Sequence, residues 1–326
     1  MKSMARPQTA TPQAASPEME GLLQLQPGPD HVRTPATERL AARALAYLDA
    51  GFPVHFRGPA GSGKTKTALD LADRLGRPVL LLVGDASFDT AALVGRESGS
   101  RTRRVVDRYI TSVMKVETET VPVWLDRALT VACTEGCTLV YDEFNRAPPA
   151  ANNVLLTVLE ERVLALPKAR GSDTAIRVHP NFRAIFTSNP EDHAGTEEAQ
   201  DALLDRMVTI DLDGFDRDTE VAIAVARSGL DPEQAGRIVD LVRDFRISRE
   251  WTRRPTLRAS VMIARLTKAQ GIEASAEEER FVEIVLDVLG SRVKPSIAGV
   301  PDPKHRQMLV RLVEHFCGPR LAGQAV

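Results

Sequence analysis

Residues 58–65 have the sequence Gly58-Pro59-Ala60-Gly61-Ser62-Gly63-Lys64-Thr65, which matches the pattern G-x-x-x-x-G-K-[ST] at every constrained position. In such a loop the glycines let backbone N–H groups turn toward phosphate oxygens at the start of a helix. The lysine can reach the β- and γ-phosphates of a nucleotide, and the following hydroxyl can bind Mg²⁺. The predicted nucleotide phosphate site is therefore residues 58–66, which include Lys64, Thr65 and Lys66.

The segments on either side of this loop have the periodicities that the motif requires. Pro53-Val54-His55-Phe56-Arg57 is a short extended stretch, and residues 66–75 carry apolar side chains at helical spacing. Strand, loop and helix in this order are the context in which the motif binds phosphate. The structural alternative is a glycine-rich turn before a helix, which leaves the Lys-Thr pair without a purpose.

Composition and charge restrict the class of protein. The chain has 326 residues, with Lys+Arg 42 against Asp+Glu 44, so no overall basic field favours a nucleic-acid partner. Cys133, Cys137 and Cys317 are too few for a disulfide framework and are expected to be reduced, packed thiols. No apolar run has the length of a membrane span, and the N-terminus lacks the apolar core of a secretory signal. We expect a soluble, cytoplasmic protein without a membrane partner.

Apolar strands alternate with helical segments over the first two thirds of the chain. Thr37 to Leu48 has helical periodicity, and four further runs are typical of buried strands: 77–84, 138–142, 181–189 and 207–212. This alternation predicts an α/β fold with a parallel, doubly wound sheet.

Three regions follow from these patterns. Residues 1–32 are rich in Pro, Gln, Thr, Ala and Ser, which predicts a disordered N-terminal tail. Residues 33–214 form the predicted α/β nucleotide-binding domain, and residues 215–326 a small all-α lid domain. The lid helices are expected at 218–227, 231–245, 256–269, 275–289 and 303–316, with Ser275-Ala276-Glu277-Glu278 as a capping box.

The apolar run Leu139-Val140-Tyr141 ends in Asp142 and Glu143. A strand that ends in this pair, following a phosphate loop, can place Asp142 to hold Mg²⁺ through water. Glu143 can then orient the attacking water or accept a proton from it. Acidic residues at strand ends are common, so the preceding phosphate loop is what gives this pair its interpretation.

Two more polar residues have both a functional and a structural interpretation. Asn189 ends the run 182–189 at the same predicted sheet edge and can bond the γ-phosphate and the water, although Asn189-Pro190 also suits a simple turn. Arg206 precedes the last strand and can act as an arginine finger on a neighbouring protomer. The alternative for Arg206 is an ordinary surface pair with Asp205.

Three arginines compete for a phosphate contact from the lid. Arg258 begins the helix expected at 256–269, and Arg253 and Arg254 directly precede Pro255. The sequence leaves the choice among them open.

Dispersed and ordered runs resemble those of the MoxR branch of AAA+ ATPases, and within that branch those of the gas vesicle protein N family. The resemblance covers about residues 35–260 and rests on these runs: 56–61, 105–110, 139–147, 152–162, 182–190 and 200–206. It implies an AAA+ ATPase fold with a five-stranded parallel core and a helical lid, which binds ATP with Mg²⁺ between protomers of a ring, commonly a hexamer.

The resemblance also implies roles for single residues. Lys64 and Thr65 bind phosphate and Mg²⁺, Asp142 and Glu143 are the acidic pair, and Asn189 is the first sensor. Arg206 is the finger and Arg258 the second sensor. The segment 85–116 corresponds to an insertion that projects from the ring, and its Arg101, Arg103 and Arg104 are either a contact surface or a solvated loop.

The leading hypothesis is an ATP-hydrolysing assembly factor for gas vesicles, associated with them in the cytoplasm and acting on shell or accessory proteins. One alternative is a nucleotide-gated structural component that docks onto the shell. Another is a sister MoxR ATPase that remodels a metalloenzyme.

Overall fold

A computed structural model describes residues 32–107, 115–170, 173–190, 197–248, 251–252, 254–293 and 303–319. All but the last residue of the predicted N-terminal tail, 1–32, lies outside the described residues. Arg253 and residues 108–110 of the run 105–110 also lie outside them.

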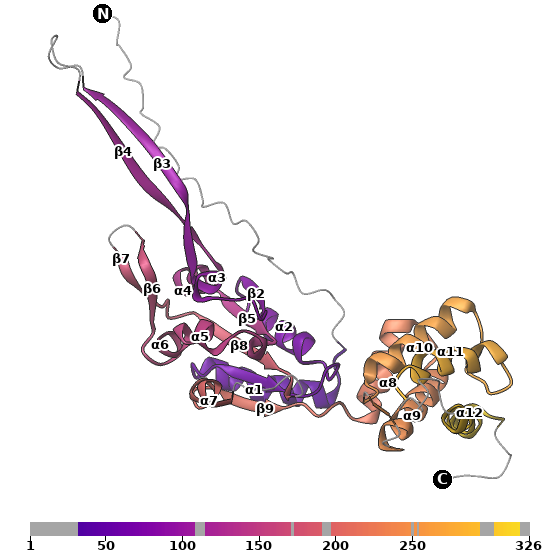
Figure 1. Cartoon of the computed structure of the whole chain (residues 1–326). Helices are drawn as coiled ribbons and strands as arrows, with labels where there is room; N and C mark the ends of the chain where they lie inside the picture. Colours follow the sequence, from indigo (N-terminus) through magenta and orange to yellow (C-terminus); the bar gives the residue numbers. More distant parts are fainter. Residues whose placement is uncertain are drawn as a thin grey trace, which may run out of the picture.

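A five-stranded parallel sheet forms the centre of the first two thirds of the chain (Figure 1). Its strands, in the order β2-β5-β8-β1-β9, are β1 (Val54–Arg57), β2 (Val79–Val83), β5 (Thr138–Asp142), β8 (Arg183–Ser188) and β9 (Val208–Asp211). The predicted α/β fold class is confirmed, and each predicted strand is present within a few residues of its expected bounds.

Both faces of the sheet are covered, which explains why the inner strands β5 and β8 have consecutive apolar residues at their centres. Val140 and Ile185 belong to a core with helices α1 (Pro35–Asp49) and α2 (Lys64–Arg74). Leu139 and Phe186 belong to a second core on the other face. That face is covered by α3 (Thr90–Val94), α4 (Ala128–Glu135), α5 (Pro149–Asn152), α6 (Val154–Glu160) and α7 (Glu197–Leu204). A strand that is buried on two faces has no polar alternation.

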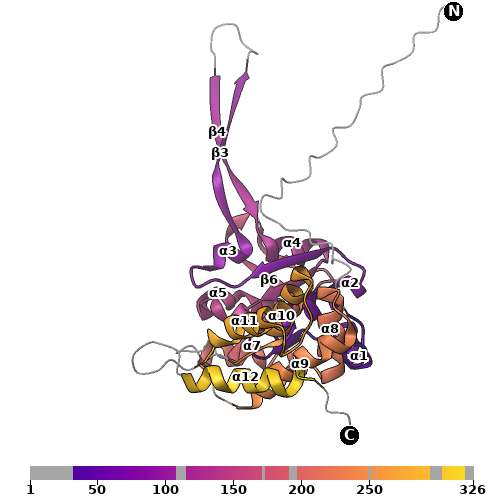
Figure 2. The same cartoon turned by 90° about the vertical axis from the view of Figure 1, so that its right-hand side faces the viewer.

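Two antiparallel hairpins were not predicted as strands. The longer one pairs β3 (Gly95–Asp107) with β4 (Lys115–Asp126) and projects from the sheet domain (Figures 1 and 2). At about 3.4 Å per residue, the 13 residues of β3 span roughly 40 Å. The shorter hairpin pairs β6 (Val163–Arg170) with β7 (Asp173–Arg177). The insertion expected at 85–116 is thus α3 followed by most of the long hairpin.

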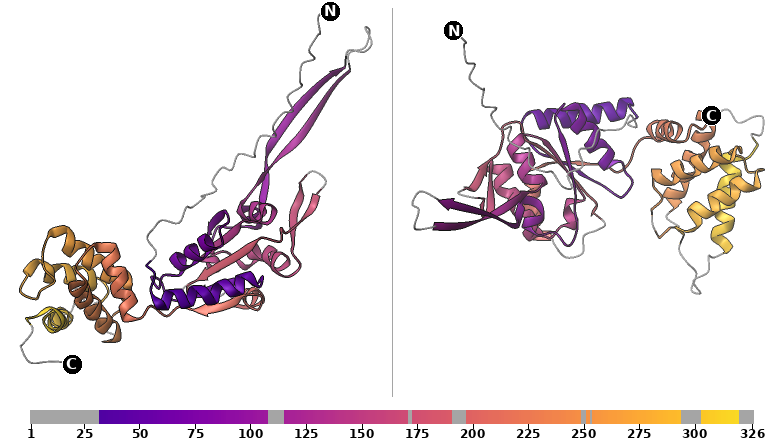
Figure 3. Two further views of the ribbon diagram at one scale, coloured as in Figure 1. Left: turned by 180° about the vertical axis from the view of Figure 1, so that it is seen from behind. Right: turned by 90° about the horizontal axis from the view of Figure 1, so that it is seen from above.

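Only helices follow β9 in the described residues up to 319, apart from an isolated bridge between Trp251 and Val293. They are α8 (Arg217–Ser228), α9 (Pro232–Ser248), α10 (Leu257–Gln270), α11 (Glu279–Gly290) and α12 (Pro303–Cys317). Figure 3 shows this helical group at the opposite end of the molecule from the long hairpin. Helices α9 to α12 share a separate apolar core built around Phe245, Ile263, Phe281 and Val313, and α8 packs on α9 in a small cluster of its own. The exact domain boundary at residue 214 stays a prediction.

The capping box predicted at residues 275–278 is wrong. Helix α11 begins at Glu279 with Glu278 as its N-cap, and no side chain caps it. The Ser275 hydroxyl instead accepts a hydrogen bond from the N–H of Glu277, and the N–H of Glu278 donates to the Ser275 carbonyl. Side-chain bonds of this kind let serine favour a turn over a helix start.

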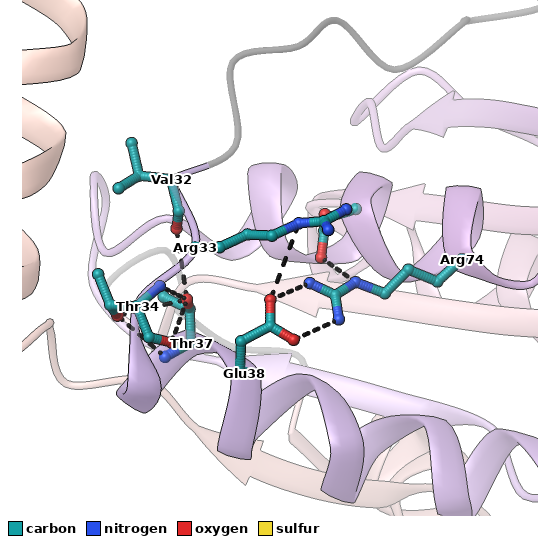
Figure 4. A network of polar contacts seen from close by, with 7 residues as sticks. Val32, Arg33, Thr34, Thr37, Glu38 and Arg74 are labelled. Carbon is teal, nitrogen blue, oxygen red and sulfur yellow. Dashed lines mark hydrogen bonds and ion pairs between the residues drawn. The ribbon is translucent and has the colours of Figure 1, made fainter.

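Helix α1 is fixed to its neighbours by polar contacts (Figure 4). The Thr34 hydroxyl accepts a bond from the Thr37 N–H, and the Thr37 hydroxyl accepts one from the Thr34 N–H, which makes a reciprocal cap. Arg74 of α2 donates to both oxygens of Glu38, at 2.7 and 2.8 Å. The Thr34 hydroxyl also lies 2.8 Å from that of Thr219 on α8, so the start of α1 contacts the lid.

None of the helices in the described ranges combines the length and apolar character needed to cross a membrane.

One ion pair of the lid is almost fully buried. Arg246 Nη1 lies 2.9 Å from Glu220 Oε1, with side chains 14% and 2% exposed. We expect Glu220→Gln to lower the free energy of unfolding by about 3 kcal/mol, because removing one charge leaves the other uncompensated. Urea unfolding followed by circular dichroism measures this. The control is Glu233→Gln in the exposed pair with Arg237, which should change stability by less than about 0.5 kcal/mol. Equal effects of the two variants would contradict the prediction.

Candidate functional site

The phosphate loop joins β1 to α2 with the backbone geometry that anion binding requires. Gly61 and Gly63 have φ of 79° and 91°, in the left-handed region that favours glycine. Gly63 is the N-cap of α2 and no side chain caps the helix, so side chains do not compete for its first N–H groups. Lys64 is 7% exposed, and its ammonium donates to the carbonyls of Gly58 and Pro59, at 2.7 and 2.8 Å.

Two residues expected at a Mg²⁺ site are in direct contact. The Thr65 hydroxyl donates to Asp142, at 2.8 Å from Oδ1 and 3.0 Å from Oδ2. Hydroxyl and carboxylate oxygens are the donors that Mg²⁺ takes, usually with several waters and substrate phosphates. The donor set therefore fits this cation, and both residues line the cleft described below.

Glu143 has an uncommon backbone conformation. Its φ of 51° lies in the left-handed region, which a residue with a side chain rarely adopts. Its carboxylate accepts a hydrogen bond of 2.7 Å from Arg146 on the short 3-10 helix η1 (Phe144–Arg146). Sequence reasoning did not assign Arg146 a role, although it stands three residues after Glu143.

Two buried hydrogen bonds of Asn152 connect Tyr141 and Phe144, the residues on either side of Asp142 and Glu143. The Tyr141 hydroxyl donates to Asn152 Oδ1 at 3.0 Å, and Asn152 Nδ2 donates to the Phe144 carbonyl at 3.0 Å. Burial raises the pKa of Tyr141, so its hydroxyl remains a donor across the physiological range. The amide of Asn152 thus links the end of β5 to η1.

The end of β8 lies beside the same pair. Thr187 contacts Asp142 and Glu143 through its hydroxyl, and Asn189 follows two residues later. Asn189 is 7% exposed, and its carbonyl accepts a bond of 3.1 Å from Asn145 Nδ2. Parallel strands bring their carboxyl ends to one edge, and this explains why residues distant in sequence meet here.

A cleft of about 700 Å³ separates this edge from the lid. Its lining comprises Ala60, Gly61, Gly63, Lys64, Thr65, Lys66, Asp142 and Glu143, and from the lid Ile223, Arg227, Leu257, Arg258, Val261, Met262, Arg265, Leu266 and Ala269. Its volume is in the range of small-molecule sites.

Three lid arginines line the cleft, of which the sequence interpretation had singled out one. Arg258 and Arg265 lie on α10 and Arg227 near the end of α8. Arg265 follows Arg258 by seven residues, two helical turns on one face, and this spacing is the signal that the sequence offered. Arg254 lines a separate, smaller pocket beside Pro59 and Ser62.

The lid also contacts the phosphate loop itself. A Cβ added at Gly61 would lie 2.7 Å from the Thr256 hydroxyl, and one at Gly63 would lie 2.7 Å from the Phe215 ring. Thr256 is the N-cap of α10, and Phe215 lies in the connection from β9 to α8. The two glycines are therefore required by close approach as well as by φ.

Arg206 follows α7 and is not among the residues that line its own chain's cleft, as far as the described lining extends. Its guanidinium forms an ion pair with Glu160 at the end of α6 and donates to the Ala202 carbonyl. The ion-pair partner of Arg206 is thus Glu160 and not the adjacent Asp205. The side chain of Arg206 is 32% exposed.

Comparison with known proteins gives this site a context. Residues 53–207 match the family model of an AAA domain of the dynein-related subfamily. The gas vesicle ATPase GvpN of Ancylobacter aquaticus is 46% identical over 309 residues, covering 94% of this chain and 84% of the relative. The gas vesicle ATPase GvpN of Haloferax mediterranei is 42% identical over 264 residues, covering 80% and 74%.

A solved structure of NtrX from Brucella abortus in complex with ADP has a TM-score of 0.50 and 15% identity, covering 88% of this chain and 61% of that one. At this identity the likeness concerns the fold alone.

Gly84, after β2, lies directly against the acidic pair. Its N–H donates to the Asp142 carbonyl at 2.8 Å, and an added Cβ would lie 2.2 Å from the Glu143 carbonyl oxygen. We expect Gly84→Ala to lower nucleotide hydrolysis about 10-fold or more, because a displacement near 1 Å can cost 10²-fold. Phosphate release measures it. Gly290→Ala, at a position with nothing within 4 Å, is the control and should behave like the parent. Unchanged hydrolysis in Gly84→Ala would contradict the expected displacement.

Proposed function

This chain belongs to the gas vesicle ATPase GvpN family of AAA-domain proteins, and on that basis we propose that it hydrolyses ATP to drive gas vesicle assembly by acting on shell or accessory proteins. The observation that carries the proposal is the convergence of Lys64, Thr65, Asp142 and Glu143 on one cleft beneath a helical lid. A protein that did not bind nucleotide would have no need of this set of residues.

In the proposed mechanism the phosphate loop and the lid hold the nucleotide between them. The N–H groups at the start of α2 and the Lys64 ammonium bind the β- and γ-phosphates, and Arg258 approaches them from α10. Lys64 then exchanges its bonds to the carbonyls of Gly58 and Pro59 for phosphate oxygens.

The acidic pair has two different tasks in this mechanism. Thr65 and Asp142 would hold Mg²⁺, the latter through water, and the bound cation would supply positive charge beside the phosphate oxygens. Glu143 orients the attacking water and accepts its proton, and Asn189 bonds the γ-phosphate and the water. For this step Glu143 must exchange its contact with Arg146 for one with the water.

We propose that Arg206 completes the site of a neighbouring protomer in a ring, commonly a hexamer. Its guanidinium is partly exposed and is held by Glu160 and by the Ala202 carbonyl, which orients it in advance. An arginine supplied in trans stabilises charge on the transferring phosphoryl group.

A nucleotide-gated docking component of the vesicle remains the second candidate function, because ordered binding needs the phosphate loop but not turnover. A MoxR-type ATPase that remodels a metalloenzyme differs from the assembly factor only in its client, and from the docking component also in hydrolysing ATP. The experiments below separate hydrolysis from docking and identify the client class.

The assembly role is tested by expressing a gas vesicle gene set with this chain present, absent or carrying Glu143→Gln. We expect light scattering that collapses under applied pressure only with the parent chain, because Glu143→Gln binds ATP without hydrolysing it. Lys64→Ala, which should lose binding as well, is the companion variant. A Glu143→Gln chain that supports assembly would indicate nucleotide-gated docking, and assembly without the chain would indicate another client.

The trans role of Arg206 is tested by mixing two inactive variants. We expect Arg206→Ala to bind ATP normally and to lose roughly 10³-fold in turnover. Mixing it with Lys64→Ala should restore part of the phosphate release, because an intact Lys64 and an intact Arg206 then meet between different protomers. Arg217→Ala, which removes an exposed pair with Asp240, is the control. No recovery on mixing would place the action of Arg206 within its own chain.

A further inference from the structure

One buried hydroxyl contacts both members of the acidic pair. Thr187 lies on β8 and is completely buried. Its Oγ1 donates a short hydrogen bond to Asp142 Oδ1 and accepts one of 2.9 Å from the N–H of Glu143. A threonine hydroxyl can donate one hydrogen bond and accept another at the same time. The Thr187 hydroxyl does both, since it donates to Asp142 and accepts from the adjacent residue Glu143.

The Asp142 carboxylate is oriented from two sides. Thr65 donates to it from α2, and Thr187 donates to it from β8. Both hydroxyls contact Oδ1, and Thr65 also contacts Oδ2. Hydrogen bonds to an ionised acceptor are stronger than neutral ones, and two of them from separate elements restrict rotation of the carboxylate.

The same hydroxyl supports the backbone of Glu143. A left-handed residue that is not glycine persists only where its surroundings hold it, and such residues cluster at functional sites. The N–H of Glu143 bonds Thr187, and its carbonyl accepts from the N–H of Arg146 at 2.9 Å. Loss of the Thr187 hydroxyl removes one of these supports without changing the packing volume, since valine has the same shape as threonine.

We propose that Thr187 is a positioning residue for ATP hydrolysis. Its hydroxyl orients Asp142 toward the cation and fixes Glu143 in the conformation from which the carboxylate can reach the attacking water. The inference rests on the roles proposed above for Asp142 and Glu143. It adds that their geometry is set by a buried residue that is not among those lining the cleft.

The test compares Thr187→Val, which removes the hydroxyl at constant shape, with Thr187→Ser, which keeps it. We expect Thr187→Val to lower kcat by about 10- to 100-fold, the usual effect of removing a hydrogen-bond partner of a metal-binding carboxylate. Thr187→Ser should restore most of the turnover. Nucleotide affinity without Mg²⁺, measured with a fluorescent ATP analogue in EDTA, should stay near that of the parent.

A second readout needs neither nucleotide nor turnover. Hydrogen exchange of the Glu143 amide should be faster in Thr187→Val than in the parent, because its acceptor is lost, and should stay slow in Thr187→Ser. The control is Thr130→Val on α4, which removes a fully buried hydroxyl bonded to the Val94 carbonyl and should leave both the exchange and kcat unchanged. If the valine variant does not fold, Thr187→Ser and Thr187→Ala give the same comparison, because they differ by a single hydroxyl.

The two readouts separate this inference from the proposed roles of the acidic pair. Parent-like kcat in Thr187→Val, or failure of Thr187→Ser to rescue it, would overturn the positioning role even when Glu143→Gln is inactive. Unchanged exchange of the Glu143 amide would show that the hydroxyl does not hold this backbone, and would also overturn it.

Discussion

The hydrogen bond from Thr65 to Asp142 connects the phosphate loop after β1 with the end of β5, two strands away in the sheet, and the rest of the site is arranged around it. Thr65 lies in the first turn of α2, Asp142 ends β5, and the two residues are 77 positions apart in the chain. They meet because parallel strands deliver their carboxyl ends to one edge and because apolar cores on both faces hold the strands in register. The lid then closes the cleft that this edge leaves open.

Much of this arrangement was predictable because it depends on local patterns. Buried parallel strands are continuous apolar runs, and the phosphate loop has fixed spacing, so the sheet and the residues 58–66, Asp142 and Glu143 followed from the sequence. The hairpin strands β3 and β4 did not, because β3 is mostly polar and Pro122 interrupts the apolar stretch of β4. The start of α11 was placed wrongly because Ser275 forms a turn with the same side chain that would have capped a helix.

Other features depend on tertiary contacts that no local pattern carries. The pairing of Arg206 with Glu160, the contact of Arg146 with Glu143 and the shared bonds of Thr187 join residues through the fold. The packing of the lid against the phosphate loop also depends on tertiary contacts. The side chains of Thr256 and Phe215 occupy the space that a Cβ at Gly61 or Gly63 would need, so the lid packs directly on the phosphate loop.

The three cysteines have a practical consequence. Cys133, Cys137 and Cys317 are free thiols, and all are buried. Burial raises the pKa of Cys133 and of Cys317 to about 12, so little reactive thiolate forms at neutral pH. Maleimide dyes should therefore leave the native thiols largely unmodified. A single cysteine introduced on the long hairpin and another on the lid would accept a fluorophore pair in an otherwise unaltered chain, so that energy transfer could follow lid rotation during turnover.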